Sequence, residues 1–331
     1  MRETYDEIDL RIIHALQIAP RAPWRRLAGP LEISTATLTR RWSDITRRGD
    51  ARITAYANPR RIGGAAMLEV SCTPSAVEEV AAAIARARQA ATVREMSGSA
   101  DLLVSVRTRS VAEAAAFIRG LRNLSGVQRI QSNVVTRLFA TAAQWRLNAL
   151  TPAQIRAVHA LAPTPPREPP RPLAELDERI VRALGRDGRA SATLLAQELG
   201  ISLNTVRRRL QPLFESGTVE IRCDISPAVA EREALAAFWL RVPPERLIAT
   251  AQAMTNAPSI RAVFTLTGPC NLFLVAWLRH PSELPDFETQ LVRLAPGIIV
   301  GDRAVQLRVL KLAGRLLGDD GRVTEVIPMD Y

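Results

Sequence analysis

The stretch that decides the fold runs from Asp177 to Ile221 and reads DERIVRALGRDGRASATLLAQELGISLNTVRRRLQPLFESGTVEI. A related stretch lies 168 residues earlier, from Asp9 to Ile53: DLRIIHALQIAPRAPWRRLAGPLEISTATLTRRWSDITRRGDARI. The two align without a gap, and 17 of the 45 aligned positions carry identical residues. Such self-similarity indicates a duplicated structural module, so each inference about one copy is checked by the other.

Each copy has the pattern of three helices. Apolar residues at its start recur at i, i+4, i+5 and i+8, the spacing of one buried helical stripe. A second, short helix follows, and then a serine, Ser34 or Ser202, stands where its hydroxyl can cap a third helix. The first stripe consists of Ile8, Ile12, Ile13 and Leu16 in one copy and of Leu176, Ile180, Val181 and Leu184 in the other.

The third helix has the features of a helix that reads DNA. Arg40 and Arg208 lie about 200° around the helix from its apolar stripe and point outward. Short residues in the first turn let the helix end approach a major groove closely. An exposed basic face can be merely solvated, but its repetition in register favours recognition. The predicted DNA-binding residues are Ser34, Thr35, Thr37, Arg40, Arg41 and Arg47, and Ser202, Asn204, Thr205, Arg207, Arg208 and Arg209.

Two of these arginines have an alternative role. Arg41 and Arg209 occupy the flank of the helix, where they can hold either a DNA phosphate or an acidic residue of the first helix. The copies also differ: Pro30 falls inside the second helix of the first copy, and Glu32 stands where the second copy has the turn residue Gly200. A non-glycine residue in such a turn can be strained, so we expect asymmetric half-sites.

Alternating strands and two more helices follow each helical module in the order βαββαβ, which is typical of a ferredoxin-like sandwich. An extended hinge with Pro59 or Pro227 precedes each sandwich. The sequence thus predicts an α+β protein in which two winged-helix/helix-turn-helix modules alternate with two ferredoxin-like βαββαβ sandwiches. The expected boundaries are 1–54 and 173–222 for the helical modules, 55–142 and 223–315 for the sandwiches, 143–172 for a Pro-rich linker with a short helix near Pro152, and 316–331 for a C-terminal tail.

Composition favours a polyanionic partner. The 331 residues carry 44 basic and 33 acidic side chains, for a net charge of +11, and Lys311 is the single lysine. A G+C-rich genome also produces this arginine bias. Cys72, Cys223 and Cys270 have no spacing typical of a disulfide framework or a metal site. With no secretory signal and no apolar run of membrane-spanning length, we expect a cytoplasmic protein with no cofactor.

These motifs resemble the Lrp/AsnC, or feast/famine, family of transcriptional regulators. The resemblance rests on LAQELGIS (Leu195–Ser202), on Thr205, Val206, Arg209, Leu210, Leu213 and Gly217, and on Ser34, Thr37, Leu38, Arg41, Ile45 and Gly49 in the first copy. It implies double-stranded DNA as the partner. Because family members usually carry one copy per chain and dimerise, this chain resembles such a dimer fused into one tandem-duplicated chain. The resemblance further implies sandwiches packed sheet against sheet, and a homo-oligomer, a dimer or tetramer of this chain.

The same resemblance implies an effector, commonly an amino acid, bound between the sandwiches at a Gly-x-x-Asp/Asn turn. The predicted effector-binding residues are Gly98, Ala100 and Asp101 in the first sandwich and Gly268, Cys270 and Asn271 in the second. Backbone N–H groups there can hold a carboxylate, and Asp101 can accept from an ammonium group. Asn271 lacks that charge, so two unequal pockets are expected. A plain β-turn would require the same residue types.

Three other functions remain open. The double architecture also resembles fused sirohaem decarboxylases, enzymes that use active-site histidines, but His14, His159 and His280 lie outside the sheet strands. An RNA-binding sandwich would stack bases on sheet aromatics, which are few here. A sensor or adaptor with degenerate DNA-binding modules is the third possibility. The sequence therefore favours a sequence-specific DNA-binding transcriptional regulator that is not an enzyme, with no catalytic or metal-binding residues predicted.

Overall fold

The computed structural model describes residues 5–58, 64–141, 145–162, 173–226, 229, 230, 232, 234–327 and 329. The chain forms two compact units, each assembled from two separate stretches. Residues 1–61 and 146–230 form one, the helical unit, and residues 62–145 and 231–331 form the other, the sheet unit. Each unit thus combines one part of both repeats. The predicted hinge residues Pro59 and Pro227 and the proline-rich segment 163–172 lie outside the described residues.

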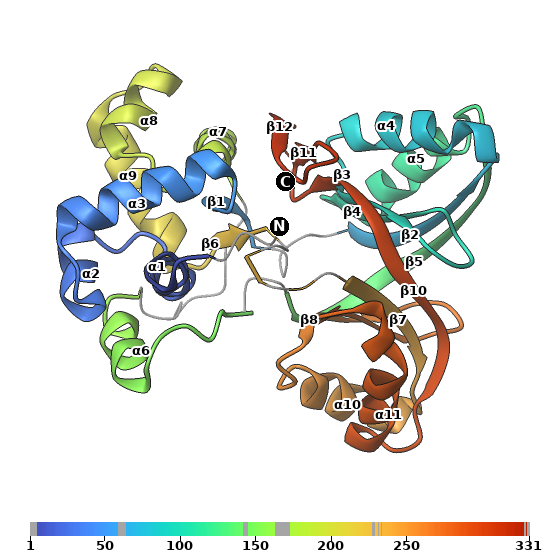
Figure 1. Ribbon diagram of the computed structural model, residues 1–331. Helices are drawn as coiled ribbons and strands as arrows, with labels where there is room; N and C mark the ends of the chain where they lie inside the picture. Colours follow the sequence, from blue (N-terminus) through green and yellow to red (C-terminus); the bar gives the residue numbers. More distant parts are fainter. Residues whose placement is uncertain are drawn as a thin grey trace. The chain divides into compact units, whose positions relative to one another are not determined.

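The helical unit contains both predicted three-helix modules (Figure 1). The strand that follows each third helix pairs with its counterpart from the other module, antiparallel from Ala51 opposite Ile225 to Ala57 opposite Val219. The two modules are therefore joined by a two-stranded sheet to which each contributes one strand. The elements are α1 (Glu7–Ile18), α2 (Trp24–Leu31), α3 (Thr35–Arg48) and β1 (Ala51–Ala57), then α7 (Glu175–Arg186), α8 (Ala192–Leu199), α9 (Leu203–Glu215) and β6 (Val219–Ile225).

Two arginines also join the modules, in a reciprocal arrangement. Arg21, between α1 and α2, donates to the carbonyl oxygens of Gly188 (2.5 Å) and Ala190 (3.1 Å) in the other module. Arg189, 168 residues later, donates to the carbonyl oxygens of Pro20 (2.6 Å) and Ala22 (2.9 Å). Partial burial lowers the pKa of both guanidinium groups, that of Arg189 to about 10. We call Arg21 and Arg189 the arginine clamp.

Glu32 occupies the left-handed turn that ends α2, as the sequence suggested. Its φ and ψ are 56° and 39°, and the equivalent Gly200 has 66° and 36°. Glycine adopts this conformation without the steric cost that a Cβ imposes. No atom lies within 4 Å of the place where a Cβ on Gly200 would stand, so backbone conformation alone decides the cost there.

This difference predicts opposite effects of two exchanges. Glu32→Gly should raise the free energy of unfolding by about 1 kcal/mol, because it relieves the left-handed strain. Gly200→Glu should lower it by a similar amount. Urea denaturation of both variants measures the two changes, and effects of the same sign would contradict the explanation.

A short helix follows the first sandwich and packs on the first module. It is α6 (Pro152–His159), and it begins at the predicted proline behind a Thr151 cap. Just before it, the backbone N–H groups of Ala149 and Leu150 both donate to Nδ1 of His14, at 3.2 and 3.1 Å. Nδ1 must therefore be unprotonated. Burial of His14, 4% exposed, lowers its pKa to about 4.

This histidine predicts an acid-sensitive helical unit. Its pKa is about 6.5 when unfolded and about 4 when folded, so between these values the unfolded chain binds a proton that the folded chain does not. The stabilisation is complete above pH 6.5 and falls by up to about 3 kcal/mol as the pH drops to 4. Urea denaturation at pH 7.5 and 5 should show the loss. His14→Gln should reduce it, whereas His280→Gln, at an exposed position, should not.

The sheet unit contains two βαββαβ sandwiches, as predicted. Figure 1 shows α4 and α5 on one side of the strands and α10 and α11 on the other. The first sandwich comprises β2 (Gly64–Cys72), α4 (Val77–Arg86), β3 (Ala90–Met96), β4 (Leu102–Thr108), α5 (Val111–Leu121) and β5 (Val127–Ala140). The second comprises β7 (Ala234–Arg241), α10 (Leu247–Met254), β8 (Ile260–Leu266), β9 (Leu272–Leu278), α11 (Leu284–Leu294) and β10 (Ile299–Leu312).

The last strand of each sandwich belongs to both sheets. The first half of β5 pairs with β2 of its own sandwich, and its second half pairs with β8 of the other. Likewise β10 pairs first with β7 and then with β3. Each sandwich is thus completed by a strand of the other, and the hydrophobic cores reflect this: Ala140 lies in the second core and Leu310 in the first.

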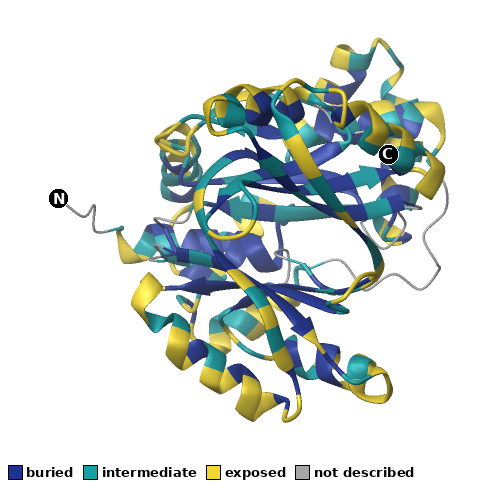
Figure 2. Ribbon diagram, turned by 90° about the vertical axis from the view of Figure 1, so that its right-hand side faces the viewer, coloured by how far each residue is buried: buried dark blue, intermediate teal, exposed yellow. Residues whose placement is uncertain are grey.

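The two sheets pack face to face, which confirms the sequence prediction. Alternate residues of β2 and β7 point to the helices or to the opposing sheet, so that buried positions line both faces (Figure 2). The layer between the sheets contains Met67, Met96, Leu103, Ala237, Trp239, Ala262, Leu266, Phe273, Val275 and Ala304. The first three come from the first sandwich and the rest from the second.

Two short strands follow β10 in the segment expected to be a C-terminal tail. They are β11 (Arg315–Leu317) and β12 (Val323–Val326), and they extend the sheet beyond β10. Strands of three and four residues are too short to show an alternating pattern, which explains why the sequence did not indicate them. No helix in the described part of the chain is both long and apolar enough to cross a membrane.

Candidate DNA-reading helices and a cavity between the sheets

The outward face of α3 and α9 carries arginines with no internal partner. Arg40, Arg207 and Arg208 are exposed and form no hydrogen bond or ion pair within the described parts of the chain. Arg40 and Arg208 occupy equivalent positions, so both third helices present a guanidinium group at the same place. A guanidinium free in this way retains all its donors for an external acceptor.

Arg41 and Arg209 instead bind acidic residues of the preceding helical layer. Arg41 forms ion pairs with Asp6 (2.7 Å) and Asp9 (2.9 Å), and Arg209 approaches the equivalent aspartate, Asp177, at 3.5 Å. Hydrogen bonds from Asp9 and Asp6 raise the pKa of Arg41. Of the two roles considered from sequence, the structure therefore shows the internal one. Arg47 is exposed and paired with Asp44.

The predicted serines and threonines begin the two reading helices. Ser34 Oγ accepts from Thr37 N (3.0 Å), and Ser202 Oγ accepts from Thr205 N (3.1 Å). The hydroxyls within each pair also lie at hydrogen-bond distance. These four residues fix the helix ends, while Thr35 and Asn204 in the first turns are exposed.

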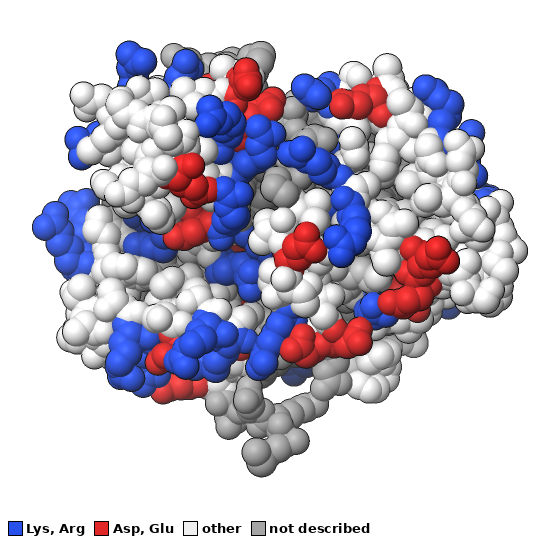
Figure 3. Space-filling view, turned by 90° about the horizontal axis from the view of Figure 1, so that it is seen from above, with Lys and Arg blue, Asp and Glu red and all other residues white. Residues whose placement is uncertain are grey.

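Figure 3 shows Lys and Arg side chains across one face of the molecule, many of them beside Asp or Glu. The ion pairs of Arg41, Arg47 and Arg209 are examples of this arrangement. Net charge thus overstates the number of free cations, and the unpaired arginines of α3 and α9 stand out from the rest.

The predicted effector turns connect β3 to β4 and β8 to β9. Gly98 and Gly268 have φ of 100° and 104°, values that favour glycine. The carboxylate of Asp101 accepts from Cys72 N (2.7 Å), at the end of β2. Asn271 makes the equivalent link twice, accepting from Val242 N (2.9 Å) and donating to Val242 O (2.8 Å). Both side chains anchor their turns.

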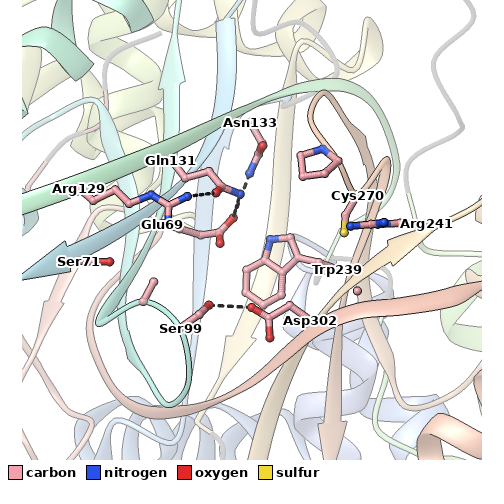
Figure 4. Close-up of a pocket in the computed structure, with 13 residues that line it drawn as sticks. Glu69, Ser71, Ser99, Arg129, Gln131, Asn133, Trp239, Arg241, Cys270 and Asp302 are labelled. Atoms are coloured by element: carbon pink, nitrogen blue, oxygen red, sulfur yellow. Dashed lines mark hydrogen bonds between the residues drawn. The ribbon is translucent and has the colours of Figure 1, made fainter.

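A cavity of about 180 Å³ lies between the two sheets. It is lined by Ser99 and Ala100 of one turn and by Pro269 and Cys270 of the other (Figure 4). The two turn motifs therefore meet at one cavity, whereas the sequence suggested two pockets. Gly98, Asp101, Gly268 and Asn271 lie outside its lining.

The strands supply the charged groups of the cavity. Glu69 of β2 accepts from Asn133 Nδ2 (3.0 Å) and Gln131 Nε2 (3.4 Å), and Arg129 donates to Gln131 Oε1 (2.9 Å). Burial raises the pKa of the Glu69 carboxyl, although the nearby Trp239 indole and Asn133 lower it. This side of the cavity is a hydrogen-bonded chain of three strand residues and one arginine.

The second sandwich contributes Trp239 and Arg241 of β7 and Asp302 of β10. The carboxylate of Asp302 accepts from Ser99 Oγ (2.7 Å) and from the backbone N–H of Arg303 (2.7 Å). Sequence reasoning missed Glu69, Trp239 and Arg241. They lie on the face opposite to the helix-packed residues of strands that were expected to meet another sheet. A charged residue on that face was the available signal.

The three histidines lie away from this cavity, since none of them lines it. His14 is buried in α1. His159 ends α6, and His280 caps the turn before α11, where its Nδ1 accepts from Ser282 N at 3.2 Å. In the described part of the chain, no cluster of three His, Cys, Asp or Glu side chains is suited to hold a metal ion.

Family models match three parts of this architecture. The AsnC-type helix-turn-helix domain matches residues 6–44, the Lrp/AsnC ligand binding domain residues 65–143, and a winged helix-turn-helix DNA-binding domain residues 173–220. The chain belongs to the Lrp/AsnC family. Within it, this is a tandem-duplicated member, because the second sandwich repeats the element order of the first.

Curated relatives of this Lrp/AsnC chain align with about one repeat. The HTH-type transcriptional regulator LrpA of Pyrococcus horikoshii is 27% identical over 138 residues, which are 41% of this chain and 98% of the relative. The regulator FL11 of the same organism is 27% identical over 128 residues, 38% of this chain and 84% of the relative.

Among solved structures, the siroheme decarboxylase NirDL superposes on nearly the whole chain. Its TM-score is 0.59, with 93% of each chain covered, and 16% of the aligned residues are identical. At this identity the likeness shows a shared fold. The two-repeat architecture is therefore known in another protein.

Proposed function

We propose that this Lrp/AsnC chain is a sequence-specific DNA-binding transcriptional regulator, whose affinity for DNA is modulated by a small effector held between the two sandwiches. The observation that carries the proposal is the selective freedom of arginines on the third helices. Arg41 and Arg209 are held by aspartates, whereas Arg40 and Arg208, one position earlier, have no internal partner among the described residues. Both modules thus offer the same free donor.

The proposed mode of binding uses both modules together. The β1–β6 pairing and the arginine clamp hold them in one compact unit. Two reading helices in one unit favour two half-sites about one DNA turn, roughly 34 Å, apart, or a multiple of that distance. Since Thr39 in α3 stands where α9 has Arg207, the half-sites should differ in sequence.

Genome-wide mapping of bound sites, followed by footprinting of the purified chain on those sites, tests the proposal. We expect paired, unequal half-sites and an affinity that falls steeply with salt, because arginine–phosphate contacts release counterions. Binding that shows no sequence preference would contradict sequence-specific regulation. Light scattering of the same preparation tests the further proposal that the chain forms a dimer or tetramer.

A tetrapyrrole enzyme is the second candidate, favoured by the full-length likeness to siroheme decarboxylase NirDL and by the cavity between the sheets. The lining of that cavity contains two arginines and no histidine. Incubation with sirohaem, followed by chromatography of the tetrapyrroles, separates the candidates. We expect unchanged sirohaem, and a decarboxylated product would favour the enzyme.

A further inference from the structure

The hydrogen-bonding groups of the cavity are unevenly satisfied. Its two carboxylates, Glu69 and Asp302, each accept two hydrogen bonds. Arg241 makes no hydrogen bond or ion pair with any described residue. The indole Nε1 of Trp239 is buried without a hydrogen-bond partner of normal geometry, although its proximity lowers the pKa of Glu69. The unused capacity is therefore that of donors.

Unused donors in a partly enclosed site favour an anionic ligand. Trp239 is 6% exposed, so water has little access to its N–H group, and a buried donor without an acceptor is destabilising. A guanidinium group matches a carboxylate with two parallel hydrogen bonds. At about 180 Å³, the cavity has room for a small organic molecule but not for a peptide or a nucleotide.

We propose that the cavity binds one small organic carboxylate per chain, with the carboxylate held by the Arg241 guanidinium and the Trp239 indole N–H. The inference rests on the proposed function, because it assigns the site and the chemical class of the effector. It places the charge recognition on β7, outside the two glycine turns that the sequence indicated.

The stoichiometry follows from the pairing of equivalent positions. Asp101 binds the backbone of Cys72, and Asn271 binds that of Val242 in the same way. Cys72 and Val242 are therefore equivalent. Two positions before Cys72, counting from the cavity-facing side, the first sandwich has different chemistry: Ser71 corresponds to Arg241, and Glu69 to Trp239. The pair of donors exists once, so one ligand per chain is expected.

Glu69 distinguishes two sources of the carboxylate. An amino acid carries an ammonium group that its carboxylate attracts, and a 2-oxo or dicarboxylic acid does not. Burial raises the pKa of Glu69, so protonation there would ease the entry of a second negative charge. Affinity for an amino acid should fall in Glu69→Gln, whereas affinity for a 2-oxo or dicarboxylic acid should hold or rise.

Calorimetric titration of the full chain tests the site. The probes are the twenty amino acids, pyruvate, 2-oxoglutarate and succinate. We expect saturable binding of at least one probe at one molecule per chain, at least tenfold weaker in Arg241→Gln and several-fold weaker in Trp239→Phe, which retains the ring. Arg293→Gln is the matched control, because Arg293 is exposed on α11 and outside the cavity lining.

Two molecules per chain, no binding of any probe, or unchanged affinity in Arg241→Gln would overturn the proposed site. Operator binding of the wild-type chain, measured without any probe, is recorded separately. Its absence would contradict the proposed regulatory function, whatever the titrations show. Intact operator binding together with failed titrations would contradict the cavity site alone.

Discussion

Replacing Arg40 and Arg208 together by alanine should weaken binding to a specific operator by about 2–6 kcal/mol, since each base-reading arginine contributes about 1–3 kcal/mol. A tenfold change in affinity corresponds to about 1.4 kcal/mol, so the loss is roughly 30-fold to 10⁴-fold. Each single variant should lose about half of this free energy, because the two side chains lie in different modules. Fluorescence anisotropy on the mapped operators measures all three values.

The control for this experiment is Arg293→Ala, which removes the same charge from an exposed position of α11 in the sheet unit. If α3 and α9 read bases, the control should bind the operator like the wild type, while Arg40→Ala and Arg208→Ala should also discriminate less between operator and random DNA. Unchanged footprints and salt dependence in both single variants would count against these helices.

Removing the arginine clamp should have the second large effect. In Arg21→Met combined with Arg189→Met, four backbone carbonyl oxygens lose guanidinium donors. A hydrogen bond to a charged group contributes about 1.5–3 kcal/mol. Part of this is offset because the two guanidinium groups, which are partly buried, no longer need to lose their water. We therefore expect a loss of about 3–6 kcal/mol in the free energy of unfolding, measured in urea.

The same variant should also bind DNA with less regard to half-site spacing. The clamp connects the loops that precede α2 and α8, so its loss leaves β1 and β6 as the main link between the modules. Operators lengthened by one or two base pairs should discriminate the wild type from the variant. Arg25→Met, an exposed arginine on α2, is the control. Equal spacing dependence in the variant and the control would contradict a positioning role.

Local patterns predicted the helices, strands and caps well. Ser34 and Ser202 cap their helices, Glu32 takes the left-handed turn, and α6 starts at Pro152. Each of these features is decided by residues close in the chain. The exchange of strands between the repeats was not predicted, because alternation along β5 shows which side chains face a core but not which strand pairs with each half.

The candidate sites divide in the same way. Arg40 and Arg208 were placed outward by helical periodicity, and the structure finds them exposed. Whether Arg41 would bind DNA or Asp9 could not be decided, since that depends on how α1 crosses α3. Asp101 was expected at a ligand and instead binds the backbone of Cys72. The cavity escaped prediction because Glu69 and Trp239 meet only after two sheets 170 residues apart in sequence pack together.

The shared strands β5 and β10 have a consequence for how the protein responds to its own abundance. In a dimer of separate chains, the paired state dissolves on dilution, and occupancy of a two-part operator depends on association as well as on DNA binding. Here each sandwich is completed by a strand of the same polypeptide. Pairing therefore persists at any dilution, and occupancy of an operator filled by one chain should rise with the first power of its concentration.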